Sequence, residues 1–136
     1  MTRLTALRLL KLTLWALSCY FLLIFLAHVT GTKLPLLFVY FDVPSTIYQD
    51  RIIAFFAFGW AVFIATTARD PGTNLQFVRA LIVAATGAII ILSFINLSTD
   101  FASYSADIEV WRFWVQTGLL AAIALWLVLL VSFAKK

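Results

Sequence analysis

The chain of 136 residues is too apolar for a water-soluble domain. Hydrophobic residues make up 64% of it and charged residues 12%, whereas soluble domains average about 45–50% and about 25%. A soluble fold of this length buries only about two thirds of its chain surface, so it could not hide this much Leu, Ile, Phe and Trp from water. The sequence therefore excludes a soluble globule and indicates a protein that lipid covers.

Four stretches contain no Asp, Glu, Lys or Arg: 12–32, 52–68, 80–99 and 113–134. A spanning helix needs roughly 20 apolar residues, because it rises about 1.5 Å per residue through a hydrocarbon layer of about 30 Å. Backbone polar groups in lipid must bond within their own segment, which leaves only helices for such runs. The sequence predicts an all-α integral membrane four-helix bundle, a single domain over 1–136, with spans near 10–30, 46–68, 76–97 and 108–134.

The connections between the predicted helices differ in character. The segment 69–72, Arg-Asp-Pro-Gly, is a stop and turn signal, so the second and third helices are expected to form an antiparallel hairpin. The apolar stretch 34–41 is too short to span and is expected to lie in the interface or across the outer end of the bundle. Pro44 breaks the chain after it, and Thr46 with Gln49 predicts a capping box at the start of the second helix.

Basic residues divide unequally between the two membrane faces. Four spans place both termini and the second connection on one side. That side holds seven Lys and Arg residues, Arg3, Arg8, Lys11, Arg69, Arg79, Lys135 and Lys136, and the other holds Lys33, Arg51 and Arg112. The positive-inside rule therefore predicts cytoplasmic termini for a multi-pass protein of the cytoplasmic (inner) membrane. The basic face suits anionic lipid headgroups, and we expect no nucleic-acid partner.

Rows of small residues predict where the helices approach one another. Between helices in lipid there is little hydrophobic drive, so close packing depends on Gly and Ala. Such rows occur in three of the predicted spans: Ala57, Ala61, Ala65, Ala80, Ala84, Ala88, Gly118 and Ala122. We expect them to form the seams of the bundle, and to serve contact with a membrane-protein partner or a second copy in a homo-oligomer.

Polar residues at the span ends gather on the side opposite the termini. They are His28, Gln49, Asp50, Arg51, Ser93, Asn96, Asp100, Glu109, Arg112 and Gln116. Polar groups in or near a span often mark function, and spacings of three and four place each set on one helix face. If those faces converge, they form an outward-facing polar vestibule with Asn96 and Gln116 at its floor. Asp50 or Glu109 would then pair with Arg112, and Asp100 with Arg51.

The vestibule hypothesis makes eight residues candidate ligand contacts: His28, Asp50, Arg51, Asn96, Asp100, Glu109, Arg112 and Gln116. Arg51 and Arg112 would contact an anion, while Asp50, Asp100 and Glu109 would accept hydrogen bonds. Ordinary interfacial ion pairs, caps and snorkelling side chains are the competing explanation of the same residues.

Familiar catalytic and cofactor arrangements are not indicated. The single His and single Cys, Cys19, offer no ligand set for zinc or di-iron and no thiol pair. The spans carry no mid-membrane acid for a proton-coupled exporter, and Ser18 and Ser93 lack the sequence context of a hydrolytic nucleophile. We therefore expect no metal, no cofactor and no catalytic residue. Cys19 is predicted to be a small core residue.

The order of features along 46–125 resembles the DoxX-like small four-helix bacterial membrane proteins. It includes Asp50-Arg51, then Ala54-Phe55-Phe56-Ala57 and Gly59, a short inner turn, and Glu109 at the start of the fourth helix. Phe56-Ala57-Phe58-Gly59 stands where that group usually has an aromatic residue followed by two glycines. The resemblance implies a fold and a cell-envelope location rather than a reaction.

Two functions are compatible with these patterns. The first is a non-catalytic accessory, assembly or structural partner in a bacterial cytoplasmic membrane. The alternative is a binding or transport module that uses the outer vestibule for a small polar ligand or a lipid headgroup.

Overall fold

A computed structural model describes residues 1–32, 47–104 and 108–135. It contains α1 (Arg3–Thr30), α2 (Ile47–Arg69), α3 (Leu75–Ser98), a short 3-10 helix η2 (Phe101–Ser103) and α4 (Val110–Ala134). All four α-helices are long and apolar enough to cross a membrane. The predicted all-α four-helix architecture is confirmed. The predictions for 34–41, Pro44 and Thr46 fall outside the described residues.

Helix α1 begins well before the predicted start near residue 10. Its N-cap is Thr2, whose side-chain oxygen accepts the backbone N–H of Thr5 at 3.3 Å. It ends at Gly31, which adopts the left-handed conformation (φ 69°) and donates its N–H to the carbonyl of Ala27. Charges mark where lipid ends, but a capped helix continues into the headgroup layer, and α1 therefore includes Arg3, Arg8 and Lys11.

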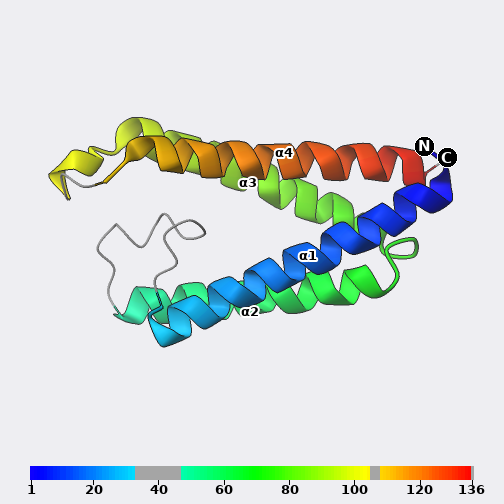
Figure 1. The fold of residues 1–136 in the computed structure, drawn as a ribbon, viewed down its shortest axis with the longest axis horizontal. Coiled ribbons are helices and arrows are strands. Elements are labelled where there is room, and N and C mark those ends of the chain that lie inside the picture. Colours follow the sequence, from blue (N-terminus) through cyan, green and yellow to red (C-terminus); the bar gives the residue numbers. More distant parts are fainter. Residues whose placement is uncertain (33–46, 105–107, 136) are drawn as a thin grey trace.

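The helices pack as two pairs joined along one contact. α1 lies against α2, α3 against α4, and α1 also contacts α4. Both termini and the α2–α3 turn lie at the same end, which we call the terminal end, and the two pairs diverge toward the other end (Figure 1). The α2–α3 connection makes the predicted turn, but the two helices hardly touch. The expected hairpin is therefore a matter of connectivity rather than of packing.

One hydrophobic core joins residues of all four helices. Its buried members include Leu10 and Leu14 of α1, Ile64 and Ala68 of α2, Val78 of α3, and Leu127, Leu130 and Val131 of α4. A second, smaller cluster contains Phe101 and Phe113, whose rings stack with centroids 4.5 Å apart. The larger core lies toward the terminal end, where both pairs come together (Figure 1).

The α1–α2 seam follows the predicted row of small residues. Ala54, Ala57 and Ala61 are buried, and the Ser18 hydroxyl donates to the carbonyl of Ala61 at 2.8 Å. A side chain that bonds a backbone carbonyl on the neighbouring helix requires close approach of the two backbones, which the alanine methyls permit.

The seam prediction is wrong for four of the other positions. Ala80 and Ala84 of α3, and Gly118 and Ala122 of α4, are exposed, while Ala65 and Ala88 are half-buried. α4 instead contributes Leu127, Leu130 and Val131 to the core. Cys19, predicted to lie in the core, is exposed as well, because the buried face of α1 passes through Leu14 and Ser18.

Two polar contacts tie α1 to α4. Arg3 donates from Nε to the carbonyl of Ala134 at 3.2 Å, which joins the first turn of α1 to the last turn of α4. Trp126 Nε1 donates to Thr13 Oγ1 at 3.1 Å. A cation at a helix C-terminus interacts favourably with the unpaired carbonyls there. These bonds hold the two helices together at the terminal end.

The turn between α2 and α3 is organised by the side chain and the carbonyl of Asp70. Thr73 donates its hydroxyl to Asp70 Oδ2 at 2.6 Å and its backbone N–H to Oδ1 at 3.3 Å. Asn74 donates from Nδ2 to the Asp70 carbonyl at 2.8 Å. The Thr73 hydroxyl, then its N–H, lower the pKa of Asp70 from its ordinary value, and the charge of Lys11 adds a smaller effect in the same direction.

We predict that Ala61→Leu destabilises the protein by about 1–3 kcal/mol, because the added carbons have no room at the α1–α2 seam. Ala122→Leu is the matched control, since Ala122 is exposed, and should leave stability unchanged. The free energy of unfolding in detergent measures both. Equal effects of the two substitutions would show that the α1–α2 seam is not tightly packed.

The Asp70 turn predicts a pH dependence. Because its folded pKa lies below the ordinary value of 3.8, the carboxylate stabilises the fold above that pH and loses this effect as the pH falls through the lowered pKa. Thr73→Val should move the pKa of Asp70 back toward 3.8, measured by NMR titration of the Asp70 carboxyl carbon. Thr66→Val, which removes only a bond within α2, should not move it. An unchanged pKa in Thr73→Val would contradict the assignment.

Candidate functional site

His28 and Asp50 form a polar contact between α1 and α2. His28 lies in the last turn of α1 and Asp50 in the first turn of α2. His28 Nδ1 and Asp50 Oδ1 are 3.2 Å apart, and their side chains are 14% and 28% exposed. The contact was not predicted, since Asp50 was considered only as one of two alternative partners of Arg112. His28 and Asp50 lie on different helices, and they meet because α1 packs against α2. Residue spacing along a single helix does not predict such a contact.

A buried polar contact joins α3 to α4. Asn96 Nδ2 donates to Thr117 Oγ1 at 3.1 Å, and Thr117 donates its hydroxyl to the carbonyl of Phe113 at 2.9 Å. Asn96 is 6% and Thr117 4% exposed. Within the described part of the chain, Asn96 Oδ1 has no hydrogen-bond partner. Thr117 was not among the predicted residues, although it follows Phe113 by one helical turn, a spacing typical of a threonine that bonds the preceding turn.

Arg112 pairs with Glu109, one of the two partners that the sequence predicted. The pair bridges one turn at the start of α4, and Arg112 also lies over the ring of Trp111, 5.9 Å from its centroid. Both charged side chains are more than a third exposed, so the pair adds little to stability. It orients the Arg112 guanidinium along α4.

The predicted pair of Asp100 with Arg51 is wrong. Both side chains are exposed, and the ion pairs among residues 1–32, 47–104 and 108–135 do not include them. Asp100 follows α3 and Arg51 lies on α2, two helices that hardly touch. Gln116 is half-buried on α4, next to Thr117.

The predicted site residues are thus arranged in groups on two helix pairs. His28 with Asp50 belongs to the α1–α2 pair, and Asn96, Glu109 and Arg112 belong to the α3–α4 pair. The pairs diverge toward this end (Figure 1). Each of these contacts stays within one helix pair, so a common vestibule remains a prediction.

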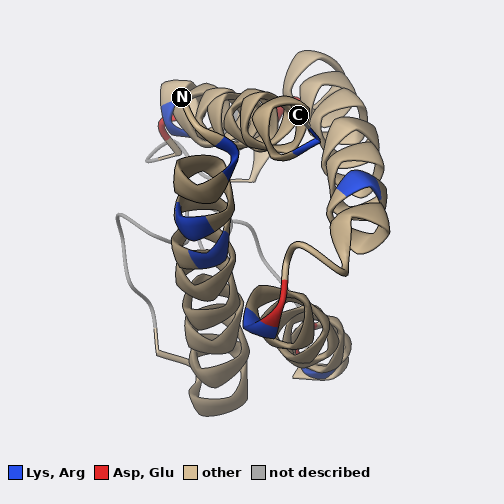
Figure 2. Ribbon diagram, turned by 90° about the vertical axis from the view of Figure 1, so that its right-hand side faces the viewer, with Lys and Arg blue, Asp and Glu red and all other residues tan. Residues whose placement is uncertain are grey.

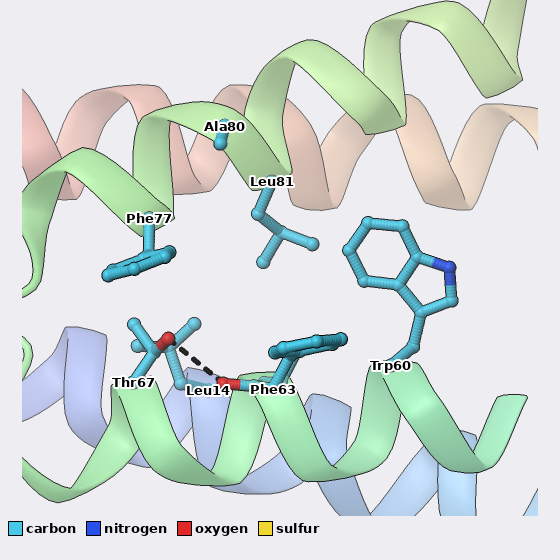
Figure 3. A pocket seen from close by; sticks show the side chains of 8 residues that line it. Leu14, Trp60, Phe63, Thr67, Phe77, Ala80 and Leu81 are labelled. Carbon is cyan, nitrogen blue, oxygen red and sulfur yellow. Dashed lines mark hydrogen bonds between the residues drawn. The ribbon is translucent and has the colours of Figure 1, made fainter. Parts of the chain in front are cut away.

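An apolar groove opens where α2 and α3 fail to pack. This α2–α3 groove has a volume of about 240 Å³ and is lined by Leu14, Trp60, Phe63, Ile64, Thr67, Phe77, Ala80 and Leu81. In Figure 3, Phe77 and Leu81 of α3 face Phe63 and Thr67 of α2 across an open space. Thr67 donates to the Phe63 carbonyl at 3.0 Å, so its hydroxyl is engaged within α2. The residues that line the groove carry no charge.

No group of three or more His, Cys, Asp and Glu residues suited to a metal ion occurs among the described residues. The comparisons with known proteins do not name a function: no family model, curated protein or solved structure matches the chain. The resemblance to the DoxX-like proteins stays a prediction.

We predict that Thr117→Val costs about 1 kcal/mol or somewhat more, because it leaves the buried Nδ2 of Asn96 without its acceptor. Thr86→Val is the matched control, since the exposed Thr86 bonds only the Ile82 carbonyl of its own helix. The free energy of unfolding in detergent reports both. If the two variants lose the same stability, the Asn96–Thr117 bond does not join α3 to α4.

Proposed function

We propose that the chain is a non-catalytic integral protein of a bacterial cytoplasmic membrane that acts as an accessory or assembly partner of another membrane protein. The observation that carries the proposal is the α2–α3 groove. The helices α2 and α3 are consecutive, yet they leave an uncharged opening of about 240 Å³ between them. The side chains of this chain alone do not fill that opening. A transmembrane helix of a partner is the proposed occupant.

The walls of the groove suit a helix. Aromatic side chains stand on both sides, with Phe63 69% and Phe77 54% exposed. Ala80 lies in the groove and Ala84 follows it one turn later on α3, and both are exposed. Small residues one turn apart let a second backbone approach closely, and flanking large residues then pack around it.

The proposed orientation places the terminal end in the cytoplasm. Arg3, Arg8, Lys11, Arg69, Arg79 and Lys135 all belong to this end, with the nearby acid Asp70. Figure 2 looks onto it and shows blue positions on α1 and at the end of α2. The excess of Lys and Arg over the opposite end supports the cytoplasmic assignment.

The second candidate function is a binding or transport module at the opposite end. One observation favours it: Asn96 Oδ1 is buried and, among described residues, unbonded, as expected of a group that waits for a donor. In this alternative, Arg112 contacts an anionic part of a small polar ligand or lipid headgroup.

Native mass spectrometry after mild detergent extraction tests the proposal. We expect a stoichiometric protein subunit bound to the chain, and we expect Ala80→Leu with Ala84→Leu to release it while helicity stays unchanged. Ala122→Leu, the same substitution at an exposed position of α4, should retain it.

Three outcomes contradict the partner role at this groove. They are a single chain without a subunit, a subunit that survives the Ala80→Leu, Ala84→Leu variant, and a subunit lost equally in Ala122→Leu. A small polar ligand that is retained by the wild type and lost in Arg112→Gln would favour the alternative instead.

A further inference from the structure

A second groove lies between α3 and α4 at the terminal end. This α3–α4 groove has a volume of about 310 Å³. Its aliphatic lining comes from Ile82 and Val83 of α3 and from Val128 and Val131 of α4, and its polar lining includes Arg79 and Lys135. It is separate from the α2–α3 groove, with which it shares no lining residue.

The antiparallel packing of α3 and α4 gathers the two cations. Arg79 lies in the second turn of α3, which starts at Leu75, and Lys135 is the C-cap of α4. Since α3 leaves the terminal end and α4 returns to it, both cations stand at that end of the groove. Neither forms an ion pair with a residue in the described ranges. Two positive charges thus line one groove, and its described lining contains no acid.

The rest of the groove becomes apolar with depth. Val83 lies one helical turn beyond Arg79, and Val131 and Val128 lie one and two turns before Lys135. Val83 is 71% and Val128 46% exposed, whereas Val131 is buried and forms the floor. The groove therefore changes from cationic at the membrane surface to aliphatic toward the bilayer interior.

We propose that the α3–α4 groove binds an anionic phospholipid of the leaflet at the terminal end, with Arg79 and Lys135 on the headgroup phosphate and one acyl chain along Val83 and Val128. An anionic phospholipid has the same order of groups as the groove. Its phosphate would lie next to the two cations, and its acyl chain would follow the aliphatic side chains. Basic pockets between transmembrane helices are suited to such headgroups. The volume is at the low end for small-molecule sites, so the groove holds part of one lipid. This inference does not depend on the partner role proposed for the α2–α3 groove.

Lipid titration followed by native mass spectrometry tests the headgroup contacts. The probes are phosphatidylglycerol and phosphatidylcholine with identical chains. Arg79→Gln with Lys135→Gln should weaken phosphatidylglycerol binding about thirtyfold, because each cation contributes about 1 kcal/mol toward an anionic lipid. Arg8→Gln with Arg69→Gln removes the same charge from exposed positions at the same end and should weaken binding less than twofold. Equal losses in the two double variants would show diffuse surface attraction and overturn the site.

A second pair of variants tests the acyl channel. Its result can be interpreted even if the charge variants fold poorly. Val83→Trp should fill the groove and weaken phosphatidylglycerol binding at least fivefold. Ile90→Trp, at another exposed position of α3, should not. Free glycerol phosphate at millimolar concentration should not displace the lipid. Displacement by glycerol phosphate, or unchanged binding in Val83→Trp, would overturn the lipid assignment, the former in favour of a soluble phosphate.

Discussion

The contact of α1 with α4 at the terminal end holds the two helix pairs in one bundle. Leu10 and Leu14 meet Leu127 and Leu130 there, in a core to which α2 adds Ile64 and α3 adds Val78. Lipid is as apolar as leucine, so this contact is maintained by shape and dispersion, together with the bonds from Arg3 and Trp126. Because α2 and α3 hardly touch, the divergence of the pairs and the α2–α3 groove depend on where this core ends.

The four spans could be predicted from the sequence because lipid excludes charge and demands backbone bonding within each segment. The positions of Arg51, Arg69, Arg79 and Arg112 therefore bracket α2, α3 and α4 closely. The pairing of the helices could not be predicted in the same way. An alanine row shows that a helix permits close approach, and Ala57 and Ala61 are indeed buried. The row does not show whether another helix of the chain packs against it. Ala80 and Ala84 form such a row, and both are exposed.

The same distinction holds for the candidate site. Contacts within one helix could be predicted from the sequence, whereas contacts between helices could not. Glu109 and Arg112 are one turn apart, so helical spacing alone predicts their pair. His28 with Asp50, and Asn96 with Thr117, join different helices, and their partners depend on which helices pack. Sequence spacing pointed to Gln116 at the floor, whereas the bonded neighbour of Asn96 is Thr117. Gln116 and Thr117 are consecutive residues of α4, so they differ only by the rotation of one residue around the helix axis. A hydrophobic pattern does not define the orientation of a helix to within one residue.

The bond between Arg3 and Ala134 joins positions 131 residues apart. The Ser18–Ala61 bond lies within the α1–α2 pair, whereas Leu10 and Leu14 of α1 share their core with Leu127 and Leu130 of α4. The face of α1 that carries these leucines is therefore covered by the helix that lies farthest from it along the chain. Closing the core is therefore a step of long sequence separation, and contacts of that kind slow folding because the intervening chain must first be ordered.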